Sequence, residues 1–376
     1  MKKTLAALAV LGAFAGSAMA ADVTLYGAVD TGFEYIHTKS TGEKGVDTFD
    51  MQSGWDTPSR WGLKGSEDLG NGYKVSFKLE SGFNSDDGTM GQSNRLFGRE
   101  AGLTLSGPFG SVAFGRFGGI SSSAGTYDML GYVESFDGGD GNVWGFASSS
   151  RYDNMVVYQT PRFAGLQLTA QYSFKTDTKE GDTVGADVKP QYNGDEGTSH
   201  AQRYASVGLS GEYGPASFAV GYELTKYGAY TNGARALDKD GQLVFVGGNY
   251  DFEVVQLFAE AQYFKHQTAI NAGDDATAEL GLGKLGLKGY GLHLGAAAPL
   301  AGGTLTAGLY YVDLSEEAVD QADEDAKYYG VSARYNYPLS ERTSLYAGAG
   351  YGQLKDDDSG NKDQLTQVYC GLVHTF

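Results

Sequence analysis

The sequence predicts an all-β fold: a 16-stranded antiparallel transmembrane β-barrel. Three observations lead to this prediction. The chain has 376 residues, with 57 Gly and 26 Tyr but only 7 Pro, a composition typical of many strands joined by tight turns. Apolar and polar residues alternate along many segments. Short connections between these segments alternate with long ones, as in barrels that have turns at one end and loops at the other.

The first twenty residues are typical of a secretory signal peptide. Lys2 and Lys3 precede an apolar or small stretch from Thr4 to Ala15, and Ala18-Met19-Ala20 is an A-x-A cleavage motif. The apolar run is too short to cross about 30 Å of hydrocarbon as a helix. We therefore expect cleavage after Ala20 and one barrel domain over residues 21–376.

Charge and composition exclude several functions. Loss of the signal peptide removes two lysines and no acid, so the formal net charge changes from −18 to −20. Such an acidic chain is a poor partner for nucleic acid. The one cysteine, Cys370, excludes an intrachain disulfide, and the histidines lack the spacing of metal ligands or of a hydrolase. We expect no cofactor, no metal site and no enzymatic activity.

The alternation has a period of two residues. In the segment beginning at Val23, Leu25, Val29 and Phe33 share one face, whereas Asp30 and Glu34 share the other. In the segment 72–83, Tyr73, Val75, Phe77 and Leu79 alternate with Lys74, Ser76, Lys78 and Glu80. Charges on one face of successive strands cannot lie in a dry core, but they can face a water-filled lumen while the apolar face contacts lipid.

This pattern predicts sixteen strands near 23–36, 59–68, 72–83, 96–106, 110–117, 151–159, 166–174, 203–212, 216–226, 243–250, 254–266, 289–299, 304–314, 327–337, 342–352 and 365–376. Each is long enough to cross a bilayer at a tilt. Residues 37–58 are expected to be the first long loop and residues 118–150 the third. Acidic stretches such as Asp356 to Asp358 fall in the loops, either as solvated charge or as sites that bridge lipid phosphates through divalent ions.

Several motifs, spread over the whole mature chain, resemble a known family. They are V-T-L-Y-G-A-V-D-T-G, S-R-W-G-L-K-G-S-E-D-L-G-N-G-Y-K, L-F-G-R-E-A-G-L-T-L-S-G-P-F-G-S-V-A-F-G-R, R-Y-D-N-M-V-V-Y-Q-T-P-R-F-A-G-L and G-L-V-H-T-F. Together they resemble the trimeric general porins of Gram-negative outer membranes, in the beta-proteobacterial and neisserial style. The resemblance implies a homotrimeric pore with its third long loop folded into the lumen. The segment from Gly102 to Thr104 and the third loop depart from the family pattern.

Charged residues are the candidates for a pore constriction, because the narrowest ring of charge decides what passes a wide barrel. Strict alternation would turn Arg99 and Arg116 toward lipid. Each arginine follows a glycine, Gly98 or Gly115, so a β-bulge could turn it inward; the alternative is that each lies at the polar end of its strand. The family resemblance favours the lumen for both. The basic wall of the constriction is expected to comprise Arg60, Lys64, Arg99, Arg116 and Arg151.

The inward loop is expected to carry the opposite charge. Residues 118–150 contain acids but no lysine or arginine, and about half of these acids are expected to line the opening while the others bind loop backbone or face the outer vestibule. Because the whole surface is acidic, we expect a weak cation preference or none. The acidic candidates are Asp128, Glu134, Asp137 and Asp140.

The expected function is a general diffusion porin, a water-filled channel for ions and small hydrophilic solutes. A substrate-specific channel is the main alternative, with an adhesin a further one. Aromatic residues of the third loop could form a solute-binding surface or pack the loop against the wall; they are Tyr127, Tyr132, Phe136, Trp144 and Phe146.

The C-terminal residues are expected to form the last strand and to close the barrel against the strand that starts at Val23, with Phe376 on the lipid face. The resemblance implies that the outer-membrane assembly machinery recognises Phe376. The other expected partners are two further copies of the chain, outer-membrane lipid and lipopolysaccharide, and the permeating solutes. The cell outer membrane is the expected location.

Overall fold

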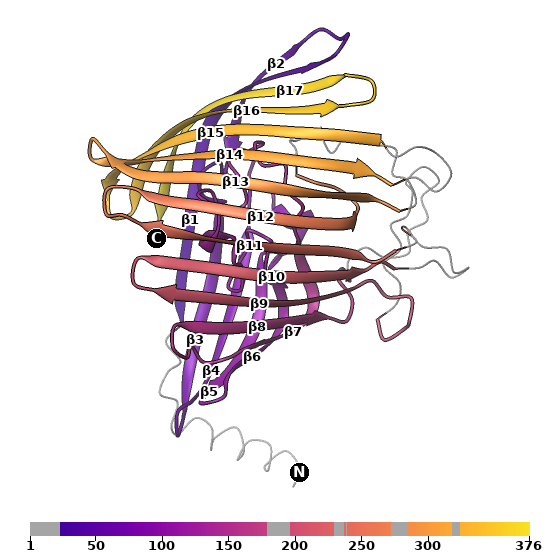
Figure 1. Cartoon of the computed structure of the whole chain (residues 1–376). Coiled ribbons are helices and arrows are strands. Elements are labelled where there is room, and N and C mark those ends of the chain that lie inside the picture. Colours follow the sequence, from indigo (N-terminus) through magenta and orange to yellow (C-terminus); the bar gives the residue numbers. More distant parts are fainter. Residues whose placement is uncertain (1–22, 179–195, 229–236, 238, 272–284, 318–323) are drawn as a thin grey trace, which may run out of the picture.

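The chain forms one antiparallel sheet that closes into a barrel (Figure 1). This computed structural model describes residues 23–178, 196–228, 237, 239–271, 285–317 and 324–376. Neighbours in the sheet follow chain order, and β1 closes the ring by pairing with β17. The strands are β1 (Thr24–Ser40), β2 (Val46–Ser53), β3 (Arg60–Gly70), β4 (Tyr73–Gly82), β5 (Glu100–Gly107), β6 (Gly110–Gly118), β7 (Arg151–Gln159), β8 (Leu166–Ser173), β9 (Arg203–Tyr213), β10 (Ala216–Lys226), β11 (Gly241–Asp251), β12 (Gln256–Gln267), β13 (Leu287–Leu300), β14 (Gly303–Glu316), β15 (Glu324–Ser340), β16 (Thr343–Asp356) and β17 (Lys362–Thr375).

Helical structure in the described ranges amounts to two short turns, α2 (Gly91–Asn94) and the 3-10 turn η1 (Leu130–Tyr132). None of the helices described is long and apolar enough to cross a membrane. The predicted signal peptide, residues 1–20, lies outside the described residues.

The seventeen strands occupy sixteen positions in the barrel. β1 pairs along one edge with β17, and along the other edge with β2 at its loop end and β3 at its turn end. The predicted 16-stranded barrel is therefore confirmed. The expectation that residues 37–58 form a loop is wrong, because β1 continues to Ser40 and Val46–Ser53 returns as β2. An irregular segment at residues 54–59, which we call the break, then leads to β3.

Asp30 on β1 holds this break in place. Its side chain is fully buried, and one carboxylate oxygen accepts hydrogen bonds from the backbone N–H groups of Asp56 and Thr57 at 2.9 and 2.8 Å. The Tyr346 hydroxyl donates to the other oxygen at 2.7 Å. The break therefore folds toward the lumen, where the ring of Trp55 stacks on Tyr369 at 4.8 Å. Alternation thus predicts that Asp30 faces the lumen, but it does not predict the break that Asp30 holds.

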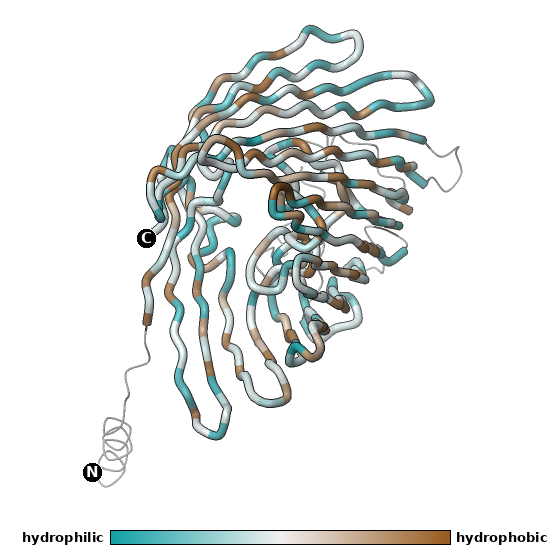
Figure 2. The backbone as a smooth tube through the Cα atoms, turned by 60° about the vertical axis from the view of Figure 1, so that its left-hand side comes forward, coloured by the Kyte–Doolittle hydropathy of each residue, from teal (hydrophilic) through white to brown (hydrophobic). Residues whose placement is uncertain are grey.

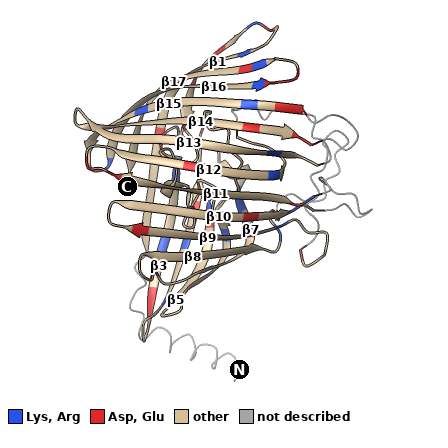
Figure 3. Ribbon diagram, viewed as in Figure 1, with Lys and Arg blue, Asp and Glu red and all other residues tan. Residues whose placement is uncertain are grey.

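The two faces of the sheet differ in chemistry, as the pattern predicts. On β1, Leu25, Val29 and Phe33 are exposed on the outer surface, whereas Asp30 and Glu34 are buried inside. Figure 2 shows hydropathy changing repeatedly along the strands of the sheet. Charged residues recur at the loop ends of β15, β16 and β17, away from the middle of the barrel (Figure 3). This distribution suits a wall between lipid and water, because a charge facing lipid at the bilayer midplane costs about 2–4 kcal/mol.

Phe376 takes part in closing the barrel. Its N–H donates to the carbonyl of Gly27 and its carbonyl accepts from the Gly27 N–H, both at 3.0 Å. The register continues from Ala28 opposite Thr375 to Ser40 opposite Asp363. The last residue therefore extends the seam between the first and last strands.

Deletion of Phe376 should lower the yield of folded barrel. It removes two backbone hydrogen bonds, each contributing about 0.5–1.5 kcal/mol, at a seam where lipid offers no replacement partner. The fraction of heat-modifiable barrel on gels after refolding in detergent measures the effect, with Phe376→Tyr as the control that keeps an aromatic ring. Equal folded fractions for the deletion and the control would contradict this role.

Candidate constriction site

The segment 119–150 between β6 and β7 is bound to strands on several sides of the barrel. Its backbone N–H groups donate to side chains on the inner face: Asn142 to Gln367 on β17 at 3.0 Å, and Ala147 to Gln262 on β12 at 2.9 Å. The Ser135 N–H donates to Nε2 of His293 on β13 at 3.2 Å. These bonds hold the segment across the interior.

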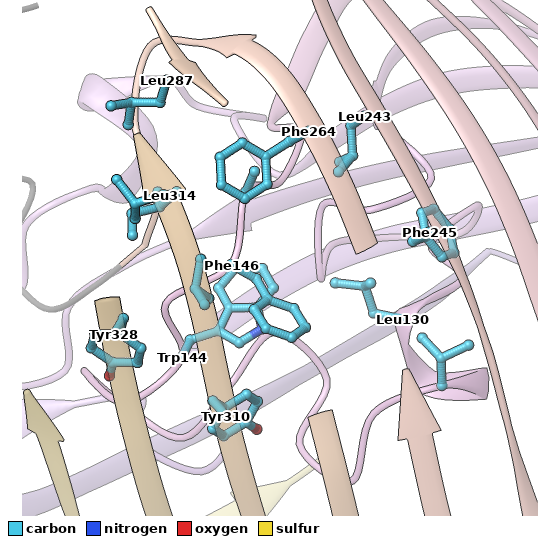
Figure 4. Close-up of a cluster of buried hydrophobic side chains, with 14 of the residues drawn as sticks. Leu130, Trp144, Phe146, Leu243, Phe245, Phe264, Leu287, Tyr310, Leu314 and Tyr328 are labelled. Atoms are coloured by element: carbon cyan, nitrogen blue, oxygen red, sulfur yellow. The ribbon is translucent and has the colours of Figure 1, made fainter. Parts of the chain in front are cut away.

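Apolar contacts fix the same segment (Figure 4). Leu130, Trp144 and Phe146 of the segment are buried in a cluster with side chains from β11 to β15. Burial of each large apolar side chain contributes about 1.5–3 kcal/mol, so the cluster is a strong anchor. The partners labelled in Figure 4 are Leu243, Phe245, Phe264, Leu287, Tyr310, Leu314 and Tyr328.

The aromatic residues of the segment pack rather than line an open surface. Tyr127 joins a second cluster with Phe117 of β6 and Tyr204 of β9, and Phe136 is 2 % exposed. Tyr132 is partly buried against the first cluster, and its hydroxyl donates to Glu212 at 2.7 Å. The rings of Phe136, Trp144 and Phe146 pack against the wall, which is one of the two possibilities that the sequence left open. Tyr127 is also packed, but it borders the second cavity described below.

A buried polar network ties both ends of the segment to β10. Glu223 accepts hydrogen bonds from the Ser121 hydroxyl at 2.9 Å, the Ser149 hydroxyl at 3.0 Å and the Tyr204 hydroxyl at 2.7 Å. It also accepts from the Ser121 backbone N–H at 3.0 Å. Since Ser121 and Ser149 lie near the two ends of the segment, one carboxylate holds both ends.

Between this segment and the opposite wall lies a cavity of about 640 Å³, which we call the upper cavity. Charged side chains of both signs line it. The lining comes from β1 to β4, from the connection between β2 and β3, from the residue before β5, from segment residues 123–142 and from Arg334 of β15. The charged lining residues are Glu34, Asp56, Arg60, Lys78, Glu80, Arg99, Asp137 and Arg334.

The basic wall is organised around Glu80 on β4. The Arg99 Nε lies 2.7 Å from one carboxylate oxygen of Glu80, and the Lys78 Nζ and the Arg60 Nε lie 3.6 and 4.0 Å from the other. The Tyr26 hydroxyl donates to the same carboxylate at 2.8 Å. Glu80 thus pairs directly with Arg99 and lies near Arg60 and Lys78, whose ammonium is closer to Glu100, at 2.7 Å.

Arg99 and Arg116 differ in their position relative to the regular strands. β5 begins only at Glu100, so Arg99 precedes the regular strand and turns inward, where it is 7 % exposed. At Arg116 the register of β6 with β7 shifts between Gly115 and Phe117. Gly115 has φ of +140°, a conformation that residues with a side chain rarely adopt, but the extra residue of this irregularity lies in β7, and the register of β6 with β5 continues through Arg116 opposite Ala101. That Arg116 faces the lumen therefore stays a prediction.

The five basic candidates occupy different places. Arg60 and Arg99 line the upper cavity, and Lys64 lines a second cavity described below. Arg116 lines neither cavity; its Nη1 lies 2.5 Å from Asp153 of β7. Arg151 also lines neither cavity, although it lies near enough to Arg99 and Arg116 for their charges to interact.

Of the four acidic candidates, Asp137 lines the upper cavity. Asp140 is fully buried, where it accepts from the Tyr369 hydroxyl at 2.5 Å and lies 3.4 Å from Arg334; burial raises the pKa of its carboxyl. Glu134 is also buried and accepts from the Trp144 ring N–H at 2.8 Å; burial, then the charge of Glu260, raises its pKa. Burial and the neighbouring Asp137 raise the pKa of Asp128. Burial also raises the pKa of Asp137, so all four carboxyls share the same direction of shift.

Sequence reasoning left out several lining residues. Lys78 and Glu80 lie on the polar face that alternation predicts for residues 72–83, so the signal was present. Arg334 also follows alternation, two residues from the buried Ser332. Trp55 and Asp56 line the cavity from the break between β2 and β3, and the sequence of this break has no periodic pattern.

A family model described as Gram-negative porin matches residues 6–358 of the chain. The chain belongs to this family. An outer membrane porin protein of Bordetella pertussis is 34% identical to this porin over 100% of both chains, and outer membrane porin protein 32 of Delftia acidovorans is 31% identical over 99% of this porin and 95% of the relative.

Solved structures share the fold of this porin. The anion-selective porin from Comamonas acidovorans superposes with a TM-score of 0.66 at 24% identity, covering 95% of this porin and all of that chain. The outer membrane channel DcaP of Acinetobacter baumannii gives 0.64 at 17% identity, with 96% and 99% covered. The chain is therefore an outer-membrane β-barrel porin and a diffusion channel, as predicted.

Proposed function

We propose that the upper cavity is the constriction through which ions and small hydrophilic solutes pass this porin. The observation that carries the proposal is the lining: charges of both signs border one cavity, with Arg60 and Arg99 contributed by the wall and Asp137 by the segment 119–150. Such a transverse field orients polar solutes, while apolar solutes lose hydration without compensation.

We further propose a modest anion preference. Of the four predicted acids only Asp137 lines the upper cavity, where Glu34, Asp56 and Glu80 supply the other negative charges. The lining of the upper cavity holds four acids and four bases, and the adjoining cavity adds Lys64, Lys74 and Glu100, an excess of one base. Loop acids at the rim act only within about a Debye length, roughly 8 Å, so the lining dominates.

The proposal extends to assembly. The porin acts as a homotrimer in contact with outer-membrane lipid and lipopolysaccharide, and Phe376 serves as the residue that the assembly machinery binds. The secretory pathway exports the chain, and cleavage of the signal peptide after Ala20 leaves a single domain over residues 21–376. The channel has no catalytic role.

Liposome swelling separates a general pore from a specific one. Vesicles containing the purified porin should swell in neutral sugars at rates that fall smoothly with sugar size and do not saturate with concentration. Saturation for one sugar class would favour the substrate-specific channel. No swelling in any sugar would reject the pore and favour an adhesive role.

A further inference from the structure

A second cavity of about 460 Å³ adjoins the upper cavity on the turn side of the barrel; we call it the lower cavity. Lys78 and Thr126 line both cavities, so the two adjoin at these residues. The lower cavity lies between the turn halves of β3, β4 and β5 and the segment residues Thr126 and Tyr127. Its charged lining residues are Lys64, Lys74, Lys78 and Glu100.

The lysines of the lower cavity are only partly neutralised. Lys78 is paired, because its ammonium lies 2.7 Å from Glu100. Lys64 and Lys74 have no ion pair within the described residues: the Lys64 ammonium lies 5.1 Å from the centre of the Tyr26 ring, and Asp68, across from Lys74 on β3, accepts instead from the Gly70 N–H at 2.8 Å. Two cations therefore face the lower cavity without a carboxylate partner.

Hydroxyl groups stand between these cations. Ser66 of β3 lies opposite Ser76 of β4, which lies opposite Thr104 of β5, so three hydroxyl residues form one row across the wall. Inward-facing positions recur every second residue along a strand. Lys64 is therefore the inward neighbour of Ser66 on β3, and Lys74 is the inward neighbour of Ser76 on β4. The cavity thus offers ammonium groups on two sides of a row of neutral donors.

We propose that the lower cavity binds the phosphoryl group of a small solute, either inorganic phosphate or a phosphate ester; the proposal rests on the function proposed above. A dianionic phosphoryl group has several acceptor oxygens and can bind both ammonium groups and the serine hydroxyls together, which a chloride ion cannot. The cavity volume exceeds that of a phosphoryl group, and Tyr127 and Phe117 form a less polar part of its lining that can receive an organic part such as a sugar ring.

The geometry suits a transient site in a channel. Lys64 and Lys74 are exposed to the lumen, so their charges are partly screened and binding is weak, with a dissociation constant on the order of 1 mM. A site of this strength concentrates the anion beside the constriction and still releases it, as conduction requires.

Block of chloride current by phosphate tests the site. Planar bilayers containing the porin carry a chloride current, and inorganic phosphate or glucose 6-phosphate is added at a pH where both are dianions. We expect a saturable decrease of chloride current for both. The double variant Lys64→Gln with Lys74→Gln should raise the half-blocking concentration about tenfold or more, since each lost charged hydrogen bond approaches that factor. Lys355→Gln, at the loop end of β16, is the matched control. Phosphate should block its chloride current at the same concentration as in the unsubstituted porin.

The two proposals fail in different ways. Chloride current without saturable block, or equal block in the double variant and the unsubstituted porin, overturns the phosphoryl site and leaves the pore intact. Absence of chloride current from the unsubstituted porin rejects the pore, and the phosphoryl site with it. Block by glucose 6-phosphate but not by inorganic phosphate identifies the ester as the ligand, and the reverse identifies the free ion.

Discussion

Replacing Arg60 and Arg99 with glutamine is expected to shift the selectivity of this porin toward cations. Both side chains line the upper cavity, where four acids face four bases, so the double variant leaves an excess of two acids. Lys78 and the Tyr26 hydroxyl remain beside Glu80, which limits the structural cost. The zero-current potential in a potassium chloride gradient should change sign relative to the unsubstituted porin.

Two further variants show whether this shift reports on the cavity. Asp137→Asn removes an acid from the opposite side of the same cavity and should shift the potential toward anions. Arg342→Gln removes a base from the turn between β15 and β16, outside both cavities, and should leave the potential unchanged. A double Arg60 and Arg99 variant with the potential of the unsubstituted porin would show that the wall does not set selectivity.

Replacing Glu223 with alanine should release the segment 119–150 from the wall. Three hydroxyl groups and one backbone N–H lose their shared acceptor in a buried position, and each unsatisfied buried group costs about 1–3 kcal/mol. The released segment would no longer fill the interior, so single-channel conductance should rise and fluctuate. Protease cleavage within residues 119–150 should also become faster.

Matched variants separate release of the segment from general damage. Glu223→Gln keeps an acceptor oxygen and should give an intermediate conductance, whereas Glu341→Ala, in an exposed turn, should behave as the unsubstituted porin. Unchanged conductance and protease resistance for Glu223→Ala in a folded barrel would mean that the apolar cluster around Phe146 holds the segment alone.

Alternation predicts the barrel because lipid on one face and water on the other impose a period of two on every strand. The sixteen expected strands therefore appear at their expected places, and Arg60 and Lys64 face cavities. The sequence does not predict β2, because this strand has only eight residues and most of them are polar. It does not predict the break that follows β2 either, because the hydrogen bonds that hold the break come from Asp30 on another strand.

The interior of the segment 119–150 could not be predicted in the same way, because it has no regular period. Asp140 is buried against Tyr369, a contact between residues 229 positions apart, and Glu134 is buried against Trp144 ten positions away. The sequence supplies the sign of these charges but not which of them face the cavity. Only the long-range packing distinguishes Asp137 from its three acidic neighbours.

Chemical modification at position 137 tests most directly whether the segment 119–150 and the arginine wall border the conducting path. In a Cys370→Ser background, which removes the exposed native thiol, Asp137→Cys places one thiol in the upper cavity. Adding a bulky charged thiol reagent to a single open channel should lower its conductance in one irreversible step. Asp47→Cys, on exposed β2 outside both cavities, should show no step. If the modified Asp137→Cys channel conducts as before, ions do not pass through the upper cavity and the proposed constriction is wrong.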